Sequence, residues 1–192
     1  DQPRTIGALD LRVGGTGQLR HLYQQGASKA LFARKRDGTE AIFINTSGGI
    51  TGGDQLNGYF ETSDTACLSV TTQGCERIYR SRACVNGTVN NRLVVRNQSS
   101  LFWLPQETLF YDGGHLERHL TIDVSSDATA LIVEPMLFGR LAMGENHLSG
   151  NLQECITRSI DAHLAFQDAT HFSVNSTHPR GRPAVLAGAR AT

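Results

Sequence analysis

Three acidic side chains and one amide of this chain lie in or beside apolar segments, where they could bind a cation. Gln106, Glu107 and Asp112 belong to the aromatic segment 100–113, and Glu134 follows the apolar run 130–133. Burying a carboxylate is costly unless it is paired with a positive side chain or ligates a metal ion. Four arginines are available for pairing: Arg77, Arg80, Arg82 and Arg140. The residues alone leave both interpretations open.

A second conspicuous segment is glycine-dense. Residues 45–54 read NTSGGITGGD, with glycines at Gly48, Gly49, Gly52 and Gly53. Glycine reaches backbone angles that other residues avoid, so this density indicates a demanding backbone path. A phosphate cradle is disfavoured, because the segment lacks the Gly-Lys-Ser/Thr ending and the G-x-G-x-x-G order, and Asp54 would repel an anion.

The sequence gives little support for other metal-binding or catalytic sites. His115 and His119 lie on an expected strand, about 13 Å apart, which is too far to chelate one ion. A site built from several strands stays open. The four cysteines Cys67, Cys75, Cys84 and Cys155 lack CxxC spacing, which argues against a structural zinc site. Neither G-x-S-x-G nor H-E-x-x-H occurs.

The elements that must position these residues are strands. Apolar and polar residues alternate over 66–71, 88–95, 119–124 and 160–166, and turn signals recur every ten to fifteen residues, among them Asn57–Gly58, 97–100 and 125–127. Residues 73–82 could form a short helix or an irregular strand, and the helix formers of 137–145 are interrupted by glycines. We therefore expect an all-β-dominated single domain over residues 1–192, with few short helices.

Composition excludes several classes of partner. The 192 residues carry 18 Lys+Arg and 18 Asp+Glu, giving a formal net charge of zero. We expect no general attraction to nucleic acid or anionic lipid, and no apolar run approaches the roughly 20 residues that span a bilayer. Since no signal peptide is visible, we expect a cytoplasmic protein, and its neutrality favours association with other proteins.

Four motifs in one order resemble the urease accessory protein family UreD, called UreH in some bacteria. They are NTSGGITGGD at 45–54, TTQ at 71–73 with RIYRS at 77–81, WLPQET at 103–108 with FYDG at 110–113, and FGRLAMGE at 138–145. The resemblance runs from about residue 5 to residue 150, and more weakly beyond. It implies an irregular β-helix-like stack, and a family domain that continues beyond Thr192.

The resemblance also implies a role in assembly and no enzymatic activity. Proteins of this family form a complex with UreF and the GTPase UreG, dock on the urease apoprotein subunits, and support nickel insertion. No tightly bound cofactor is expected, only transient Ni²⁺. An internal polar tunnel would use the carboxylate, water and imidazole ligands that such divalent ions prefer, in weak and labile contacts. On this basis we expect six tunnel residues: Asp54, Glu76, Gln106, Glu107, Asp112 and Glu134.

Two other functions remain open at this stage. Buried acids could form the site of a metal-dependent hydrolase. Alternatively, the chain could be a structural module that only bridges proteins, with its acids paired internally.

Overall fold

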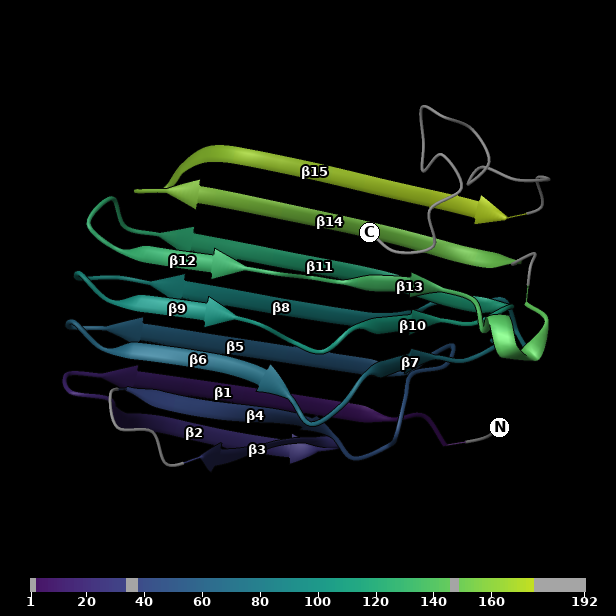
Figure 1. The fold of residues 1–192 in the computed structure, drawn as a ribbon, viewed down its shortest axis with the longest axis horizontal. Coiled ribbons are helices and arrows are strands. Elements are labelled where there is room, and N and C mark those ends of the chain that lie inside the picture. Colours follow the sequence, from purple (N-terminus) through teal and green to yellow (C-terminus); the bar gives the residue numbers. More distant parts are fainter. Residues whose placement is uncertain (1–2, 34–37, 146–148, 175–192) are drawn as a thin grey trace.

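The fold is described by a computed structural model, which covers residues 3–33, 38–145 and 149–174. These residues form two layers of strands stacked face to face (Figure 1). The first layer is a seven-stranded sheet in the order β15-β14-β11-β8-β5-β1-β2. Its strands are β1 (Ile6–Gly14), β2 (Gln18–Gly26), β5 (Gln55–Ser63), β8 (Gly87–Val95), β11 (Gly114–Val124), β14 (Gly150–Ile160) and β15 (His163–Val174).

The second layer is divided into two smaller sheets that lie side by side (Figure 1). A five-stranded sheet has the order β12-β9-β6-β4-β3, and a three-stranded sheet has the order β13-β10-β7. Their strands are β3 (Ser28–Ala33), β4 (Thr39–Asn45), β6 (Cys67–Thr72), β7 (Glu76–Ile78), β9 (Ser100–Trp103), β10 (Thr108–Phe110), β12 (Thr129–Ile132) and β13 (Met136–Phe138). A 3₁₀ turn covers Leu141–Met143.

The chain winds between the layers as a stack of coils. Strands β5, β8, β11 and β14 pair in parallel in the first layer. Between them the chain crosses to the second layer, through β6 and β7, then β9 and β10, then β12 and β13. The all-β, β-helix-like fold expected from the period-two pattern and from the family resemblance is therefore confirmed.

Each crossing of the second layer contains one bend. The bends are residues 73–75, 104–107 and 133–135, and each separates a strand of the five-stranded sheet from a strand of the three-stranded sheet. Successive coils are held in register on both sides of the bends: Val70 pairs with Trp103, and Glu76 with Thr108. Residues about 30 positions apart in the sequence therefore meet at the bends.

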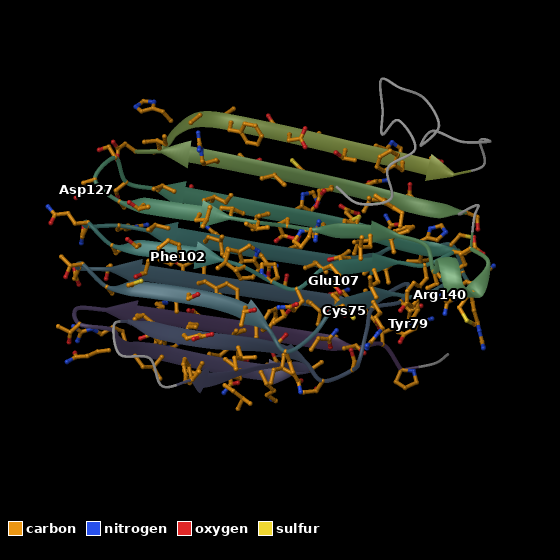
Figure 2. The ribbon with its side chains drawn as sticks, in the orientation of Figure 1. Cys75, Tyr79, Phe102, Glu107, Asp127 and Arg140 are labelled. Carbon is orange, nitrogen blue, oxygen red and sulfur yellow. The ribbon has the colours of Figure 1, made fainter. Side chains whose placement is uncertain are left out.

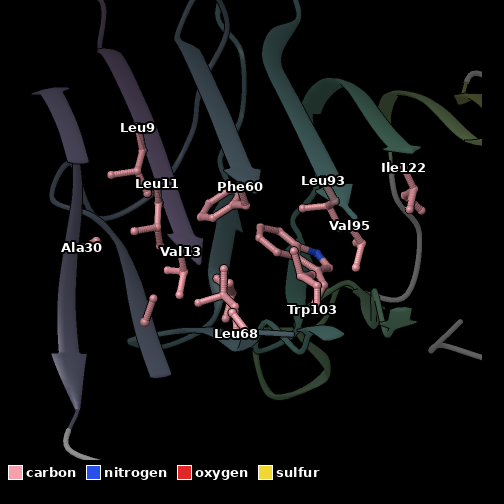
Figure 3. Close-up of a cluster of buried hydrophobic side chains, with 14 of the residues drawn as sticks. Leu9, Leu11, Val13, Ala30, Phe60, Leu68, Leu93, Val95, Trp103 and Ile122 are labelled. Atoms are coloured by element: carbon pink, nitrogen blue, oxygen red, sulfur yellow. The ribbon is translucent and has the colours of Figure 1, made fainter. Parts of the chain in front are cut away.

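Two apolar clusters fill the space between the layers. The larger packs Phe60 against Trp103, with ring centroids 4.9 Å apart, under the five-stranded sheet (Figure 3). The smaller includes Ile78, Phe110 and Met136 and lies under the three-stranded sheet. Each fully buried large apolar side chain contributes about 1.5–3 kcal/mol, so the two clusters fix the layers on either side of the bends.

Some predicted elements are wrong in detail. Asn57–Gly58 was expected to turn, but it lies inside β5, where a Cβ on Gly58 would meet Asn91 Oδ1 at 2.4 Å. The glycine there permits close approach of the neighbouring strand and does not mark a turn. The expected strand 160–166 spans the end of β14, a turn at Asp161–Ala162 with positive φ, and the start of β15. Within the described residues, no helix is long and apolar enough to cross a membrane.

Candidate functional site

A cavity of about 60 Å³ lies between the layers at the bends, and we call it the inner cavity. This volume holds about four water molecules. Both layers line it, because the bends interrupt the second layer where the two apolar clusters meet. Its polar lining residues are Thr72, Glu76, Asn91, Gln106, Thr108, Arg118 and Glu134. Three of the six predicted tunnel residues, Glu76, Gln106 and Glu134, are thus brought together. Glu76 follows the first bend, Gln106 belongs to the second and Glu134 to the third.

Glu76 carries the carboxylate of this cavity that has no cationic partner within ion-pair distance among the described residues. It begins β7 directly after the first bend. Its Oε2 accepts a hydrogen bond from Asn45 Nδ2 at 3.1 Å, and its Oε1 accepts one from the backbone N–H of Arg77 at 3.1 Å. Desolvation by the surrounding protein raises the pKa of Glu76 above its ordinary value, although both hydrogen bonds act in the opposite direction. A perturbed carboxylate in a cavity is a candidate for function.

Glu134, in contrast, is fully engaged with protein partners. Its Oε2 accepts a hydrogen bond from Arg118 Nη1 at 2.7 Å, and its Oε1 accepts one from the indole N–H of Trp103. Arg118 also donates to Glu154 Oε1 from Nε at 2.6 Å, and to Thr108 Oγ1. The Arg118 side chain is only 8% exposed, so one buried guanidinium serves two carboxylates.

Arg118 was not among the residues predicted from the sequence. The four arginines considered as partners did not include it, although a signal was present. Residues 116, 120 and 122 form the buried face of β11, and position 118 shares their phase in the alternation. An arginine on the apolar face of a strand predicts a buried acid opposite it.

A second depression, of about 290 Å³, opens beside the inner cavity, and we call it the outer hollow. The two share Phe43, Thr72 and Glu76 as lining residues. Asn45 also lines the outer hollow and belongs to the glycine-dense segment. Its side chain donates to both Glu76 and the carbonyl of Gly49. The glycine-dense segment is therefore connected to the candidate site through Asn45.

The remaining predicted residues differ in position. Gln106 is exposed where it lines the cavity, and its backbone N–H donates to Thr72 Oγ1 at 2.9 Å. Glu107 is not a lining residue of either depression, although its carbonyl accepts the N–H of Glu76 at 3.0 Å. Figure 2 shows where Glu107 and Cys75 lie on the second layer.

Asp112 lies at the surface, outside the inner cavity. It forms an ion pair with Arg80, one of the four arginines expected as partners, and accepts hydrogen bonds from the N–H and hydroxyl of Ser149 at 2.7 and 2.8 Å. Partial burial works to raise the pKa of Asp112, but these donors and the Arg80 charge outweigh it, so the pKa is lowered. Asp112 has the environment of a structural ion pair.

Asp54 is 4% exposed and also lies outside the cavity lining. Its Oδ1 accepts the N–H of Thr5 and its Oδ2 accepts the N–H of Thr51, both at 2.8 Å. The carboxylate thus binds the glycine-dense segment to the start of β1. The segment itself is a structural turn: Gly48, Gly49 and Gly53 have positive φ, and a Cβ on Gly52 would meet Ser81 Oγ at 2.1 Å.

Metal-binding clusters are absent from the described part of the chain. No group of three or more His, Cys, Asp or Glu side chains there is placed to hold one ion. His115 and His119 both lie on β11, as the alternating pattern indicated, and His119 contacts Glu117. All four cysteines are free thiols. The inner cavity therefore offers isolated oxygen ligands and no closed cage.

The chain was compared with known proteins. A family model described as "UreD urease accessory protein" matches residues 6–192. A protein of Ruegeria pomeroyi named urease accessory protein UreD is 40% identical over 180 residues, which cover 93% of this chain and 70% of the relative. A protein of Roseobacter denitrificans with the same name is 39% identical over 194 residues, covering 100% of this chain and 71% of the relative. A third, from Ruegeria sp. strain TM1040, is 36% identical, and the alignment covers 59% of its length.

These matches extend across nearly the whole chain and include the four motifs at 45–54, 71–81, 103–113 and 138–145. Their extent and their agreement with one another establish the family. The chain belongs to the UreD family of urease accessory proteins.

Proposed function

We propose that this chain acts as a non-enzymatic scaffold in the maturation of urease, and that its inner cavity is part of a path for Ni²⁺. In this role it forms a complex with UreF and UreG and docks on apo-urease. The carrying observation is that Glu76, Gln106 and Glu134, chosen from the sequence, line one cavity between the two layers. Glu76 also lines the outer hollow, so the same side chain borders both the surface depression and the inner cavity.

The chemistry of the lining fits a transient cation. Carboxylate, amide and hydroxyl oxygens bind Ni²⁺ weakly and exchange readily. Two carboxylates and one guanidinium line the cavity, and that guanidinium is shared with Glu154. Glu76 has no ion-pair partner of its own among the described residues, and the more distant charge of Arg77 balances it only in part, so a passing cation could neutralise its charge. Because no cluster of ligands surrounds it, an ion would be released as readily as it is bound.

The test replaces Glu76 with glutamine in the full chain. Glu76→Gln keeps the shape of the side chain and the acceptor for Asn45, but removes the charge. We expect the complex with UreF to form normally, while the nickel content and activity of reconstituted urease fall several-fold. Glu107→Gln is the matched control, because it removes a nearby carboxylate that lines neither depression.

Two results would contradict the proposal. Normal nickel loading of urease with Glu76→Gln would show that the cavity is not part of the nickel path. It would favour the alternative that the chain only bridges proteins. An equal loss with Glu107→Gln would show that the effect is one of surface charge and not of the cavity.

A further inference from the structure

Beside the outer hollow lies a group of arginines and tyrosines in which Tyr79, Arg80 and Arg140 are exposed, while Arg77 is half-buried and Tyr111 is buried. We call Arg77, Tyr79, Arg80, Tyr111 and Arg140 the arginine–tyrosine patch. Figure 2 shows Tyr79 and Arg140 at the end of the second layer where β7 and β10 lie. None of these five side chains lines the inner cavity or belongs to either apolar cluster, so the packing between the layers does not account for their arrangement.

Tyr79 is 42% exposed but is fixed on two sides. Its ring contacts that of Tyr111 edge to face, with centroids 5.6 Å apart. On the other side it lies against the backbone of Gly49, where a Cβ would come within 2.3 Å of Tyr79 Cε2. The glycine at this position therefore lets an exposed tyrosine rest directly on the loop.

Arg140 is held in a similar way. Its Cζ lies 4.2 Å from the centroid of the Tyr111 ring, and its Nε donates to Glu145 Oε1 at 3.0 Å. Its side chain remains 43% exposed. Side chains that are already ordered lose little conformational entropy on binding, and Tyr and Arg are the residue types that dominate binding hot spots.

The three arginines of the patch have two ion-paired carboxylates between them. Asp112 pairs with Arg80, and Glu145 pairs with Arg140, but within the described residues no carboxylate lies within ion-pair distance of Arg77. Beyond that distance, the charge of Arg77 acts on the largely buried Glu76 and lowers its pKa, the Arg77 side chain hydrogen-bonds Tyr111, and both Arg77 and Glu76 line the outer hollow. Each guanidinium has five donors, and the two exposed ion pairs leave several of them directed at solvent.

The outer face of the three-stranded sheet extends the patch with apolar surface. Arg77, Leu109 and Leu137 are aligned across β7, β10 and β13. Leu137 is 37% exposed, and Met143 in the following 3₁₀ turn is 70% exposed. A positive and aromatic surface bordered by apolar side chains matches a protein segment that carries both carboxylates and apolar residues.

We propose that the arginine–tyrosine patch is the docking site for an acidic segment of a protein partner, which on binding covers the outer hollow. Carboxylates of the partner would take the unused guanidinium donors, and its apolar side chains would pack on Tyr79. This inference rests on the proposed function, because the partner is taken to be one of the proteins of urease assembly.

The test measures binding of the full chain, by calorimetry, to purified UreF, UreG and apo-urease in turn, at low and high salt. We expect one of them to bind, with an affinity that falls as salt rises. Tyr79→Ala and Arg140→Gln should each weaken that binding at least tenfold. Circular dichroism of each variant verifies that the fold is retained.

The chain supplies closely matched controls. Arg12 is ion-paired with Asp10, lies 4.9 Å from the centroid of the Tyr59 ring and is 45% exposed, so Arg12→Gln reproduces the Arg140 change away from the patch. Tyr23, 49% exposed on β2, is the corresponding control for Tyr79. We expect both controls to bind as the wild type does.

Each outcome decides between the proposals. If the wild type binds a partner and the patch variants bind equally well, the patch is not the docking site. The proposal about the inner cavity is unaffected by that result. If the wild type binds none of the three proteins, the proposed function and this inference both fail. Binding of an RNA oligonucleotide that is lost in Tyr79→Ala, with protein binding unchanged, would replace the acidic protein segment with a nucleic acid.

Discussion

At the scale of single residues, the acids of this chain divide by their partners. Asp54 binds backbone N–H groups, Asp112 pairs with Arg80, and Glu134 pairs with Arg118. Glu76 differs, because its contacts are an amide and one N–H and its pKa is raised by desolvation. The sequence identified residues of the cavity, but it could not rank them, since a buried acid's role depends on a partner some 16 to 50 positions away.

The raised pKa of Glu76 has a consequence for stability. Below the ordinary value of 4.5 the carboxyl is protonated in both the folded and the unfolded chain, and burial carries no charge penalty. As pH rises, the unfolded chain loses this proton first, and folding is increasingly disfavoured until the pH passes the raised pKa. The wild type therefore loses stability through this window.

Glu76→Gln should remove that loss. We expect the variant and the wild type to have similar unfolding free energies near pH 4, and the variant to be the more stable above the raised pKa. Urea unfolding at a series of pH values measures the difference. A variant less stable than the wild type at neutral pH would mean that the charge of Glu76 is compensated in the folded protein.

At the scale of elements, the strands and the glycine-dense turn were predicted well, but the Asn57–Gly58 turn was not. Alternation over 88–95 and 119–124 corresponds to β8 and β11, because each strand has one face on the apolar clusters. The Asn57–Gly58 pair was taken as a turn signal, yet Gly58 lies within β5, where the absence of a side chain leaves room for Asn91. Local sequence cannot distinguish these two uses, since close approach is a property of the neighbouring strand.

The glycine-dense segment allows that distinction to be tested. A Cβ on Gly52 would lie 2.4 Å from the carbonyl oxygen of Val85, whereas one on Gly48 meets nothing within 4 Å. Gly52→Ala should therefore lower the free energy of unfolding by several kcal/mol, because backbone atoms must move. Gly48→Ala should cost about 1 kcal/mol, from its φ of 78° alone. Thermal melts of both variants give the comparison, and equal losses would contradict the packing at Gly52.

At the scale of the whole molecule, apolar contacts join the two layers within the described residues, and the Arg118 guanidinium adds a charged connection. Arg118 and Glu154 belong to β11 and β14 of the first layer, and Glu134 belongs to a bend of the second. The layered architecture followed from periodicity and from the resemblance to UreD. The connection through Arg118 did not, because it depends on the register of coils that have no visible sequence repeat.

Removing the guanidinium should leave the two largely buried carboxylates of Glu134 and Glu154 without a counter-charge. Arg118→Met should lower the free energy of unfolding by about 3–5 kcal/mol at neutral pH. Adding Glu134→Gln and Glu154→Gln to it should restore a large part of that loss, because uncharged side chains need no partner. Denaturant unfolding of the single and triple variants tests this, and a triple variant weaker than the single one would show that hydrogen bonding outweighs charge here.

The bends of successive coils are regularly spaced inside the molecule. Neighbouring strands of a sheet are about 4.8 Å apart, so three adjacent bends extend over about 10 Å. Glu76 follows the first of these bends and Glu134 belongs to the third. The backbone positions of these two carboxylates are therefore two coils apart, although both side chains line the same cavity. A cation that moved along the bends would pass from the ligands of one coil to those of the next. Its path length would then be a whole number of coil spacings.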